Sequence, residues 1–276
     1  MPPGVRLQVK FWGVRGSIPT PAPENLGYGG NTTCLEVRSA RGILVIDAGT
    51  GVRNLGLTLQ QEFKSTPCSV TMLLTHFHWD HIQGLPFFAP LYSPSNEVTF
   101  HANRSPERIE ELLEGQMSSP YFPVNFELLS AKRRFAGESS GPHDHNGIRV
   151  HQFPLNHPQG ASGYRIEQDG AVIVHASDAE HGNPQMDRIL REHAQNADIL
   201  IIDAQYTPEE YESKRGWGHS TWLEAAQIAR DCGVKQLVLF HHDPAHDDGA
   251  VDAIVANARR HFENTVAAKE GWLAGV

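Results

Sequence analysis

The sequence predicts an α/β fold, because short apolar runs alternate with amphipathic segments along its 276 residues. Apolar runs of about four to eight residues are typical of buried strands, whereas apolar residues spaced three or four apart are typical of helices. Several of these runs end at a histidine or an aspartate, and α/β proteins carry their chemistry at the C-terminal ends of strands. No linker or internal repeat interrupts the series, so we expect a single domain over residues 1–276.

The N-terminal part of the chain begins with an expected strand at residues 7–11, where apolar and polar side chains alternate. A passage rich in Gly, Pro and Asn follows as far as Thr32. It indicates an irregular loop, for which a hairpin connection is the plain alternative. Residues 33–38 and 43–46 are expected to pair as strands. Asp47 then opens a helical segment, so a helix N-cap is its simplest role.

The later elements follow the same patterns. Asp169-Gly170 is a strong turn signal and predicts a hairpin around it. Ser220 or Thr221 can cap the helix that follows them. The other expected strands are 70–74, 97–101, 148–153, 164–167, 171–175, 199–202 and a last one at 236–240. The other expected helices are 107–113, 184–193, 222–230 and a closing helix at 251–262.

Two loops leave alternatives open. The aromatic side chains of Tyr121 and Phe122 could stack a nucleobase, but packing beneath the loop is the commoner fate of such residues. His143-Asp144-His145 could form an additional metal site. Turn-forming residues surround it, so we favour a solvated loop.

Composition narrows the classes of partner. The formal net charge is −9, with 32 acidic and 23 basic residues, which offers no general basic surface for tRNA or duplex DNA. A small anionic substrate held by metal ions is still allowed. Cys34, Cys68 and Cys232 are widely spaced and odd in number, which gives no disulfide framework and fits a reducing compartment. The N-terminus lacks a signal-peptide pattern and no segment is apolar enough to span a membrane, so we expect a cytoplasmic protein.

The densest chemical signal is the segment 76–81, directly after the apolar run that ends at Thr75. Four strong metal-ligand side chains within six residues do not form a core-packing pattern. Neutral imidazoles suit zinc, iron and related divalent metals, and a carboxylate among them adds charge. The four side chains are His76, His78, Asp80 and His81.

This segment resembles the HxHxDH signature of the metallo-β-lactamase superfamily, and the strand before it and the Gly-Leu turn after it match as well. The resemblance implies a four-layer αβ/βα sandwich, in which two mixed sheets lie between helices. It also implies that His76 and His78 bind one metal, and that Asp80 and His81 bind a second. In the family, an aspartate at the position of Asp47 supports the metal loop from behind without binding metal.

The phosphodiesterase branch of the superfamily implies three further ligands. They are a third histidine for the first site, an aspartate that bridges both sites, and a final histidine for the second site. On this sequence these roles correspond to His157, Asp178 and His241, each of which follows an apolar run. His242 is the alternative to His241, but the register of residues 237–241 favours the earlier residue.

Gly218-His219-Ser220-Thr221 resembles the histidine motif of the ribonuclease Z-like and cyclic-phosphodiesterase branch. By that resemblance His219 is a catalytic residue that faces the phosphate, where it stabilises developing charge or protonates the leaving oxygen. Asp203 would orient it. The plain alternative for His219 is a helix-start histidine hydrogen-bonded to a loop.

These features lead to a dinuclear metal-dependent phosphodiesterase as the first hypothesis for function. Its substrate is expected to be a small phosphodiester such as a 3′,5′-cyclic nucleotide, attacked by a metal-bridging hydroxide that Asp80 orients or deprotonates. The cofactors are expected to be two divalent ions, Zn²⁺ first, with Mn²⁺ or Fe²⁺ as alternatives. We expect neither a long nucleic acid nor a membrane as partner, and a homodimer is compatible with the sequence.

Three alternatives remain. A ribonuclease Z-like nuclease is the nearest, but those enzymes commonly carry a long tRNA-gripping arm between the third histidine and the bridging aspartate, where this chain has only residues 158–177. A lactonase or β-lactamase-type hydrolase would use a similar metal site on a carboxylic bond. A non-catalytic metal-dependent sensor is the weakest of the three, because the full set of expected ligands is present.

Overall fold

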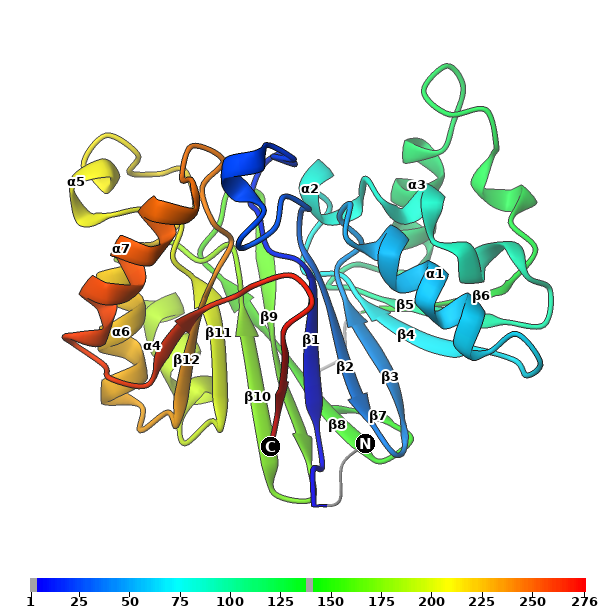
Figure 1. Cartoon of the computed structure of the whole chain (residues 1–276). Helices are drawn as coiled ribbons and strands as arrows, with labels where there is room; N and C mark the ends of the chain where they lie inside the picture. The colour runs from blue at the N-terminus through cyan, green and yellow to red at the C-terminus, as the bar shows by residue number, and fades with distance from the viewer. Residues whose placement is uncertain (1–3, 138–140) are drawn as a thin grey trace.

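The computed structural model of the chain describes residues 4–137 and 141–276. In it, two mixed β-sheets lie face to face with helices on their outer sides (Figure 1). This architecture confirms both the predicted α/β class and the four-layer αβ/βα sandwich. Each sheet has seven strands within the described residues.

The first sheet joins the N-terminal strands to a strand from the C-terminus. Its spatial order is β14-β1-β2-β3-β4-β5-β6; neighbours from β14 to β3 are antiparallel and those from β3 to β6 are parallel. In chain order its strands are β1 (Gln8–Gly13), β2 (Cys34–Ser39), β3 (Gly42–Ile46), β4 (Ser69–Leu73), β5 (Glu97–His101), β6 (Lys132–Ala136) and β14 (Leu273–Gly275).

The second sheet is built from the later part of the chain. Its spatial order is β13-β12-β11-β10-β9-β8-β7; neighbours from β13 to β10 are parallel and those from β10 to β7 are antiparallel. In chain order its strands are β7 (His143–His145), β8 (Ile148–Leu155), β9 (Ala161–Gln168), β10 (Ala171–Ala176), β11 (Ile199–Asp203), β12 (Gln236–Phe240) and β13 (Thr265–Ala267).

The core has three apolar layers. One lies between the sheets and includes Phe11, Tyr164 and Phe240. A second lies between the first sheet and the helices α1 (Val52–Glu62) and α3 (Pro106–Gln116). The third lies between the second sheet and the helices α4 (Pro184–Ala194), α6 (Trp222–Asp231) and α7 (Asp248–Arg259). Central strands such as β11 are therefore buried on both faces, which explains their continuous apolar sequence.

The remaining regular segments are short. The four-residue helices are α2 (Trp79–Ile82) and α5 (Pro208–Tyr211). The 3₁₀ turns are Pro23–Asn25, Leu85–Phe87, Ala89–Tyr92 and Phe126–Leu128. In residues 4–137 and 141–276, no helix is both long and apolar enough to cross a bilayer.

Most expected elements are confirmed, including the hairpin of β9 and β10 around Asp169-Gly170 and the cap of α6, where the Thr221 side chain accepts the N–H of Glu224. Two expectations at the C-terminus were wrong. The strand at 236–240 is not the last one, because β13 and β14 follow it, and the helix at 251–262 ends at Arg259 and does not close the chain. Strands of three residues carry too few side chains to produce a periodic pattern.

One alternative is excluded and one local expectation was wrong. Asp47 does not cap a helix, which was the plain alternative to its supporting role, since α1 begins at Val52 with Gly51 at its N-cap. The segment His143–His145 is not a solvated loop but the edge strand β7, which pairs with β8. Its two histidines are half-buried and pack toward the ring of His101.

The loops that follow the strands lie at the same edge of the two sheets. Strands β3 to β6 run parallel, as do β8, β10, β11 and β12, so their C-terminal ends lie at a common edge of each sheet. The helix α2, which carries part of the histidine-rich segment, lies at the upper edge of the molecule in Figure 1.

Candidate metal centre

The structure brings together all seven metal ligands expected from the sequence. His76 and His78 lie in the loop after β4, and Asp80 and His81 lie on α2. The other three come from the second sheet: His157 follows β8, Asp178 follows β10 and His241 follows β12. Five elements therefore contribute to one cluster at the C-terminal edge of the strands.

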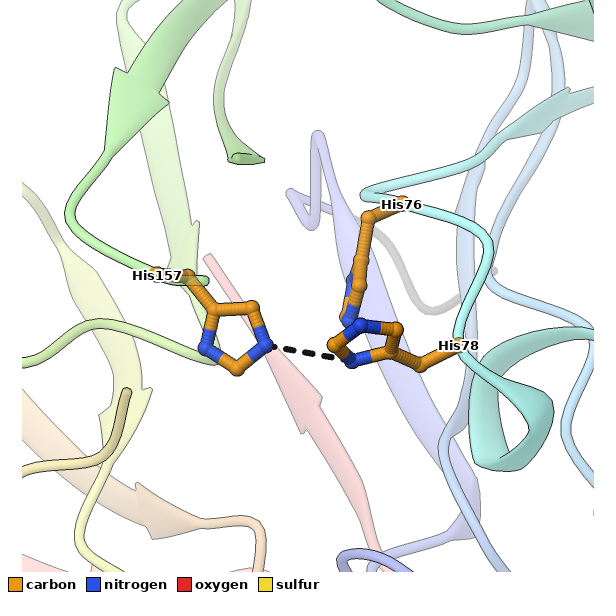
Figure 2. A group of neighbouring side chains, drawn as sticks. All are labelled: His76, His78 and His157. Carbon is orange, nitrogen blue, oxygen red and sulfur yellow. Dashed lines mark hydrogen bonds between the residues drawn. The ribbon is translucent and has the colours of Figure 1, made fainter. Parts of the chain in front are cut away.

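A first group consists of His76, His78 and His157, which offer ligand atoms within 4.8 Å of one another. Figure 2 shows the three imidazoles converging from two sides, His76 and His78 from one loop and His157 from the opposite one. Nε2 of His157 lies 3.2 Å from Nδ1 of His78. Three imidazole nitrogens at this spacing can hold one zinc or iron ion and leave a coordination position open.

A second group consists of Asp80, His81 and His241, again with ligand atoms within 4.8 Å of one another. Oδ2 of Asp80 lies 3.3 Å from Nε2 of His81 and 3.3 Å from Nε2 of His241. This second group is buried, and it includes a carboxylate, which adds charge to the site.

Asp178 lies between the two groups, and its two oxygen atoms face different histidines. Oδ1 is 3.9 Å from Nε2 of His76 and 3.7 Å from Nε2 of His157. Oδ2 is 3.2 Å from Nε2 of His81 and 3.3 Å from Nε2 of His241. One carboxylate placed in this way can provide an oxygen to each of two cations.

Two histidines of the cluster, His157 and His241, are held through the ring nitrogen that faces away from it. Nδ1 of His157 lies 2.9 Å from the carbonyl oxygen of Gly218, and Nδ1 of His241 lies 2.8 Å from Oε1 of Gln205. Such partners fix the tautomer and the orientation of a metal-ligating imidazole. The arrangement leaves Nε2 directed at the cluster.

Asp47 has the same orienting function for His81. Its Oδ2 lies 2.7 Å from Nδ1 of His81, and its carboxylate also accepts hydrogen bonds from the backbone N–H and the hydroxyl of Thr75. The Thr75 hydroxyl in turn lies 3.0 Å from Nδ1 of His76. A buried aspartate therefore supports the histidine loop from behind, as the resemblance implied.

The donor set fits divalent cations. Within the described residues, the buried Nε2 atom of His76 has no hydrogen-bond partner, although buried ring nitrogens are normally paired. Burial lowers the pKa of His76 well below its ordinary value, which leaves the neutral ring that a metal requires.

The electrostatics of the cluster favour a cation as well. Burial opposes protonation of His81, yet the carboxylates of Asp178, Asp80 and Asp47 raise its pKa well above the ordinary value. Burial likewise opposes ionisation of Asp178, but His241 and His81 lower its carboxyl pKa well below the usual range. The field created by these carboxylates therefore attracts positive charge into a buried site.

The backbone is strained at three of these strand ends. Asp47, Asp178 and His241 have φ values of 61°, 59° and 64°, in the left-handed region that non-glycine residues seldom adopt. Such conformations cost about 1–3 kcal/mol each and persist where the surrounding contacts impose them. Their concentration here marks the cluster as a functional site.

His219 lies beside the cluster and is tied to Asp203. Its Nδ1 is 2.8 Å from Oδ2 of Asp203 and 3.9 Å from Oδ1 of Asp178. Burial opposes protonation of this ring, but the Asp203 carboxylate raises the pKa of His219 to about 9. A protonated imidazole at the edge of the cluster can donate a proton or stabilise negative charge.

His241 and its neighbour His242 point to different places. His241 faces the two carboxylates of the cluster, whereas Nε2 of His242 lies 2.9 Å from the carbonyl oxygen of Ala268 and its ring packs edge-on against Tyr28. This geometry favours His241 over His242 as the final ligand.

The other residues that the sequence singled out lie outside the cluster. The half-buried ring of Phe122 packs against Phe87 and the second apolar layer, while Tyr121 is exposed. His143 and His145 pack toward His101 and are not among the groups of the described residues that could hold a metal ion.

The sequence analysis does not identify three residues that lie beside the cluster. The N–H of Ser17 donates to Oδ2 of Asp80 at 2.7 Å, while Trp79 and Gln159 line a cavity of about 460 Å³ that Asp80, Asp178 and His219 also line. Nothing in the local sequence marks Ser17 or Gln159, because their roles arise from loops that meet only in the fold. Trp79 could have been noticed as a large aromatic residue between two expected ligands.

The chain resembles known proteins in sequence and in fold. Residues 43–242 match the family model described as a β-lactamase superfamily domain. The ribonuclease Z of Thermoplasma acidophilum is 23% identical over an alignment that covers 96% of this chain and 94% of the relative.

Solved structures with the same fold include the metallo-β-lactamase fold protein YhfI from Bacillus subtilis, with a TM-score of 0.74, 18% identity and coverage of 99% of this chain and 100% of the other. The short form of human tRNase Z gives a TM-score of 0.67 and 18% identity, and covers 97% of this chain and 98% of the other.

Proposed function

Because the chain belongs to the metallo-β-lactamase superfamily and is a metal-dependent hydrolase, we propose that it hydrolyses phosphodiesters at a dinuclear metal site. The observation that carries this proposal is the position of Asp178, whose two oxygens face different groups of histidines. A carboxylate shared between two metals is the arrangement expected of a site that clamps the oxygens of a displacement at phosphorus.

The proposed ligands divide between two ions. His76, His78 and His157 would hold the first ion, and Asp80, His81 and His241 the second, with Asp178 shared. Two divalent cations in one site make water a better nucleophile near neutral pH and neutralise charge on the phosphoryl oxygens. Zinc is the first choice for so many imidazoles, and manganese or iron would also suit the donor set.

The chain's own residues provide the rest of the chemistry. His219, held by Asp203 and carrying a raised pKa, is suited to protonate the leaving oxygen or to stabilise charge on the phosphoryl group. Asp80 faces the interior of the cluster, where its carboxylate can orient water, and the N–H of Ser17 fixes one of its oxygens. The presence of both His219 and Asp80 at the cluster favours phosphodiester chemistry over lactone or β-lactam hydrolysis.

Curated relatives named ribonuclease Z support a nuclease more than they support a cyclic-nucleotide phosphodiesterase. We therefore place cleavage of an RNA phosphodiester first as the substrate class. The expected cyclic-nucleotide activity becomes the second candidate. In its favour, residues 158–177 form the compact hairpin of β9 and β10 and contain no extended arm that could grip a tRNA.

The proposed setting is the cytoplasm, where the thiols of Cys34, Cys68 and Cys232, which form no disulfide, would stay reduced. The acidic composition argues against broad contact with a polyanion, so we propose a short or terminal stretch of nucleotides as the partner. We also propose that residues 1–276 form one domain and that the protein can form a homodimer.

The test is hydrolysis of bis(p-nitrophenyl) phosphate by protein loaded in turn with zinc, manganese and iron. A precursor tRNA, 3′,5′-cyclic AMP and a lactone are assayed beside it. We expect phosphodiester hydrolysis that is lost in His76→Ala and retained in His261→Ala, a matched change at an exposed histidine. Protein that contains two metals but hydrolyses only the lactone would refute the proposal. Protein inert toward every ester would support the non-catalytic sensor instead.

A further inference from the structure

A large exposed tryptophan stands beside the metal cluster. The side chain of Trp79 is 77% exposed, although it lies between the proposed ligands His78 and Asp80 in the sequence. It belongs to none of the three apolar layers that the described residues form. Exposure of so large an apolar ring does not stabilise the fold, since it is burial of apolar surface that is favourable in water.

The backbone beneath Trp79 is fixed. It is the first residue of α2, and its carbonyl oxygen accepts the N–H of Gln83 at 2.7 Å. The next two residues of the helix, Asp80 and His81, are buried in the cluster. The ring is therefore presented from a rigid element, which lowers the entropy lost when a ligand packs against it.

The cavity beside Trp79 matches a nucleotide in size and chemistry. Its volume of about 460 Å³ lies within the range typical of small-molecule sites. Ser17 and Gln159 line it and can hydrogen-bond the edge of a base, and Asp178 and His219 line it as well.

Charge distinguishes this cavity from a groove that follows a nucleic-acid backbone. Of the described residues that line it, none is Lys or Arg. Binding energy outside the scissile phosphate must therefore come from stacking and base-edge hydrogen bonds, since ion pairs with neighbouring phosphates are not available.

We infer that Trp79 is a stacking platform for the nucleobase adjacent to the scissile phosphate, so that the site selects a nucleoside-bearing phosphodiester. This inference rests on the proposed function and names the substrate class of the same site. Trp79 lines the same cavity as Asp80 and Asp178, so one nucleotide in that cavity can contact both the indole and the cluster.

The test uses two probes that differ only in the base, AMP and ribose 5-phosphate, titrated calorimetrically into metal-loaded protein. We expect Trp79→Ala to weaken AMP binding by about tenfold, within the range typical of base stacking on an aromatic side chain, and to change ribose 5-phosphate binding by less than about twofold. Trp79→Phe should retain most of the affinity for AMP.

A matched control is Trp217→Ala, since Trp217 is also exposed, at 57%, but does not line this cavity. It should bind both probes like the wild type. Equal losses for AMP and ribose 5-phosphate in Trp79→Ala, or no loss for either, would overturn the inference. The proposed function fails separately, if protein that binds AMP through Trp79 hydrolyses no phosphodiester.

The kinetic counterpart uses the dinucleotide ApA. The Trp79→Ala change should raise KM for ApA and leave kcat nearly unchanged, because stacking on a base that does not itself react contributes equally to the bound substrate and the transition state. A lower kcat with an unchanged KM would mean that Trp79 acts in the chemical step, and would contradict a binding role.

Discussion

Oδ2 of Asp203 lies 2.8 Å from Nδ1 of His219, and both residues are buried. The same carboxylate also accepts the backbone N–H groups of Asp178 and Ser220. Asp203 therefore fixes the imidazole of His219 relative to the residue that lies between the two metal-binding groups. Because Asp203 holds His219 and His219 is not among the seven proposed ligands, its contribution can be tested separately from theirs.

The first prediction concerns His219. Replacement by Ala should lower kcat for bis(p-nitrophenyl) phosphate by about 10²–10³, the loss typical of removing one group that stabilises charge in a transition state. The metal content should not change, because the seven proposed ligands remain. Steady-state kinetics and elemental analysis of the same preparation measure the two quantities.

His261→Ala provides the control for a generic histidine substitution, as its ring is exposed. A His219→Ala protein that loses metal in proportion to activity would show that His219 acts as a ligand. Full activity in that variant would leave it with the structural role of a helix-start histidine.

The second prediction separates His241 from His242. His241→Ala should reduce the bound metal from about two ions to about one per chain, since Nε2 of His241 faces the carboxylates of the cluster. His242→Ala should retain both ions, because its ring bonds to the carbonyl oxygen of Ala268.

Loss of the buried hydrogen bond in His242→Ala should still lower the free energy of unfolding, by about 1–3 kcal/mol. The two variants thus differ in which quantity changes, metal stoichiometry or stability. Loss of one metal in His242→Ala with two retained in His241→Ala would reverse the assignment.

The third prediction concerns the close contact between Gly16 and His241. A Cβ atom on residue 16 would lie 2.4 Å from Cε1 and Nδ1 of His241. Gly16→Ala must therefore displace a ring that Gln205 holds in place. We expect at least a tenfold loss of affinity for the second metal ion, comparable to the loss when a supporting contact of a ligand is removed, measured by competition with a chelator.

Gly115→Ala is the matched control for this change. Gly115 lies in α3, and among the described residues a Cβ there would meet no atom within 4 Å. That variant should bind metal like the wild type and gain stability of about 0.5–1 kcal/mol from better helix propensity. Normal metal affinity in Gly16→Ala would mean that His241 can move without loss of the site.

The proposed ligands could be identified from the sequence because each signal is local. His241 directly follows an apolar run that indicates a buried strand, and His157 lies two residues after the alternating strand β8. Parallel strands bring their C-terminal ends to one edge, so residues far apart in the sequence were expected to meet there. The metal cluster is therefore the part of the structure that local patterns describe best.

The supporting contacts could not be predicted because their partners come from distant loops. Arg15 is fully buried, and its guanidinium donates to the carbonyl oxygens of Gly29, Asp243 and His246. A carbonyl acceptor leaves no signature in a sequence. The positive φ of Asp47 is likewise imposed by its bonds to Thr75 and His81, and not by its neighbours in the chain.

The same limit explains two strands that the sequence analysis does not predict. Lys132–Ala136 and His143–His145 are polar edge strands, and their burial is intermittent. An edge strand with one neighbour needs no apolar alternation, so its sequence is hard to distinguish from a loop.

The last prediction concerns His101, whose ring is buried near His143 and His145. Burial, with smaller contributions from the two neighbouring histidines, lowers the pKa of His101 from 6.5 to about 4. Below pH 6.5 the unfolded chain therefore binds a proton that the folded chain does not bind until about pH 4. Stability must fall as the pH falls through this window, by up to about 3 kcal/mol from this residue. His101→Phe removes the titrating group, so its free energy of unfolding should fall less steeply than that of the wild type between pH 6.5 and 4. Urea unfolding of metal-free protein at several pH values measures both curves.

The control is His261→Phe, at an exposed position, which should follow the wild type. Parallel curves for His101→Phe and wild type would mean that His101 is already protonated in the folded chain, in which case its neighbours His143 and His145 could not both stay close to it without a counter-charge.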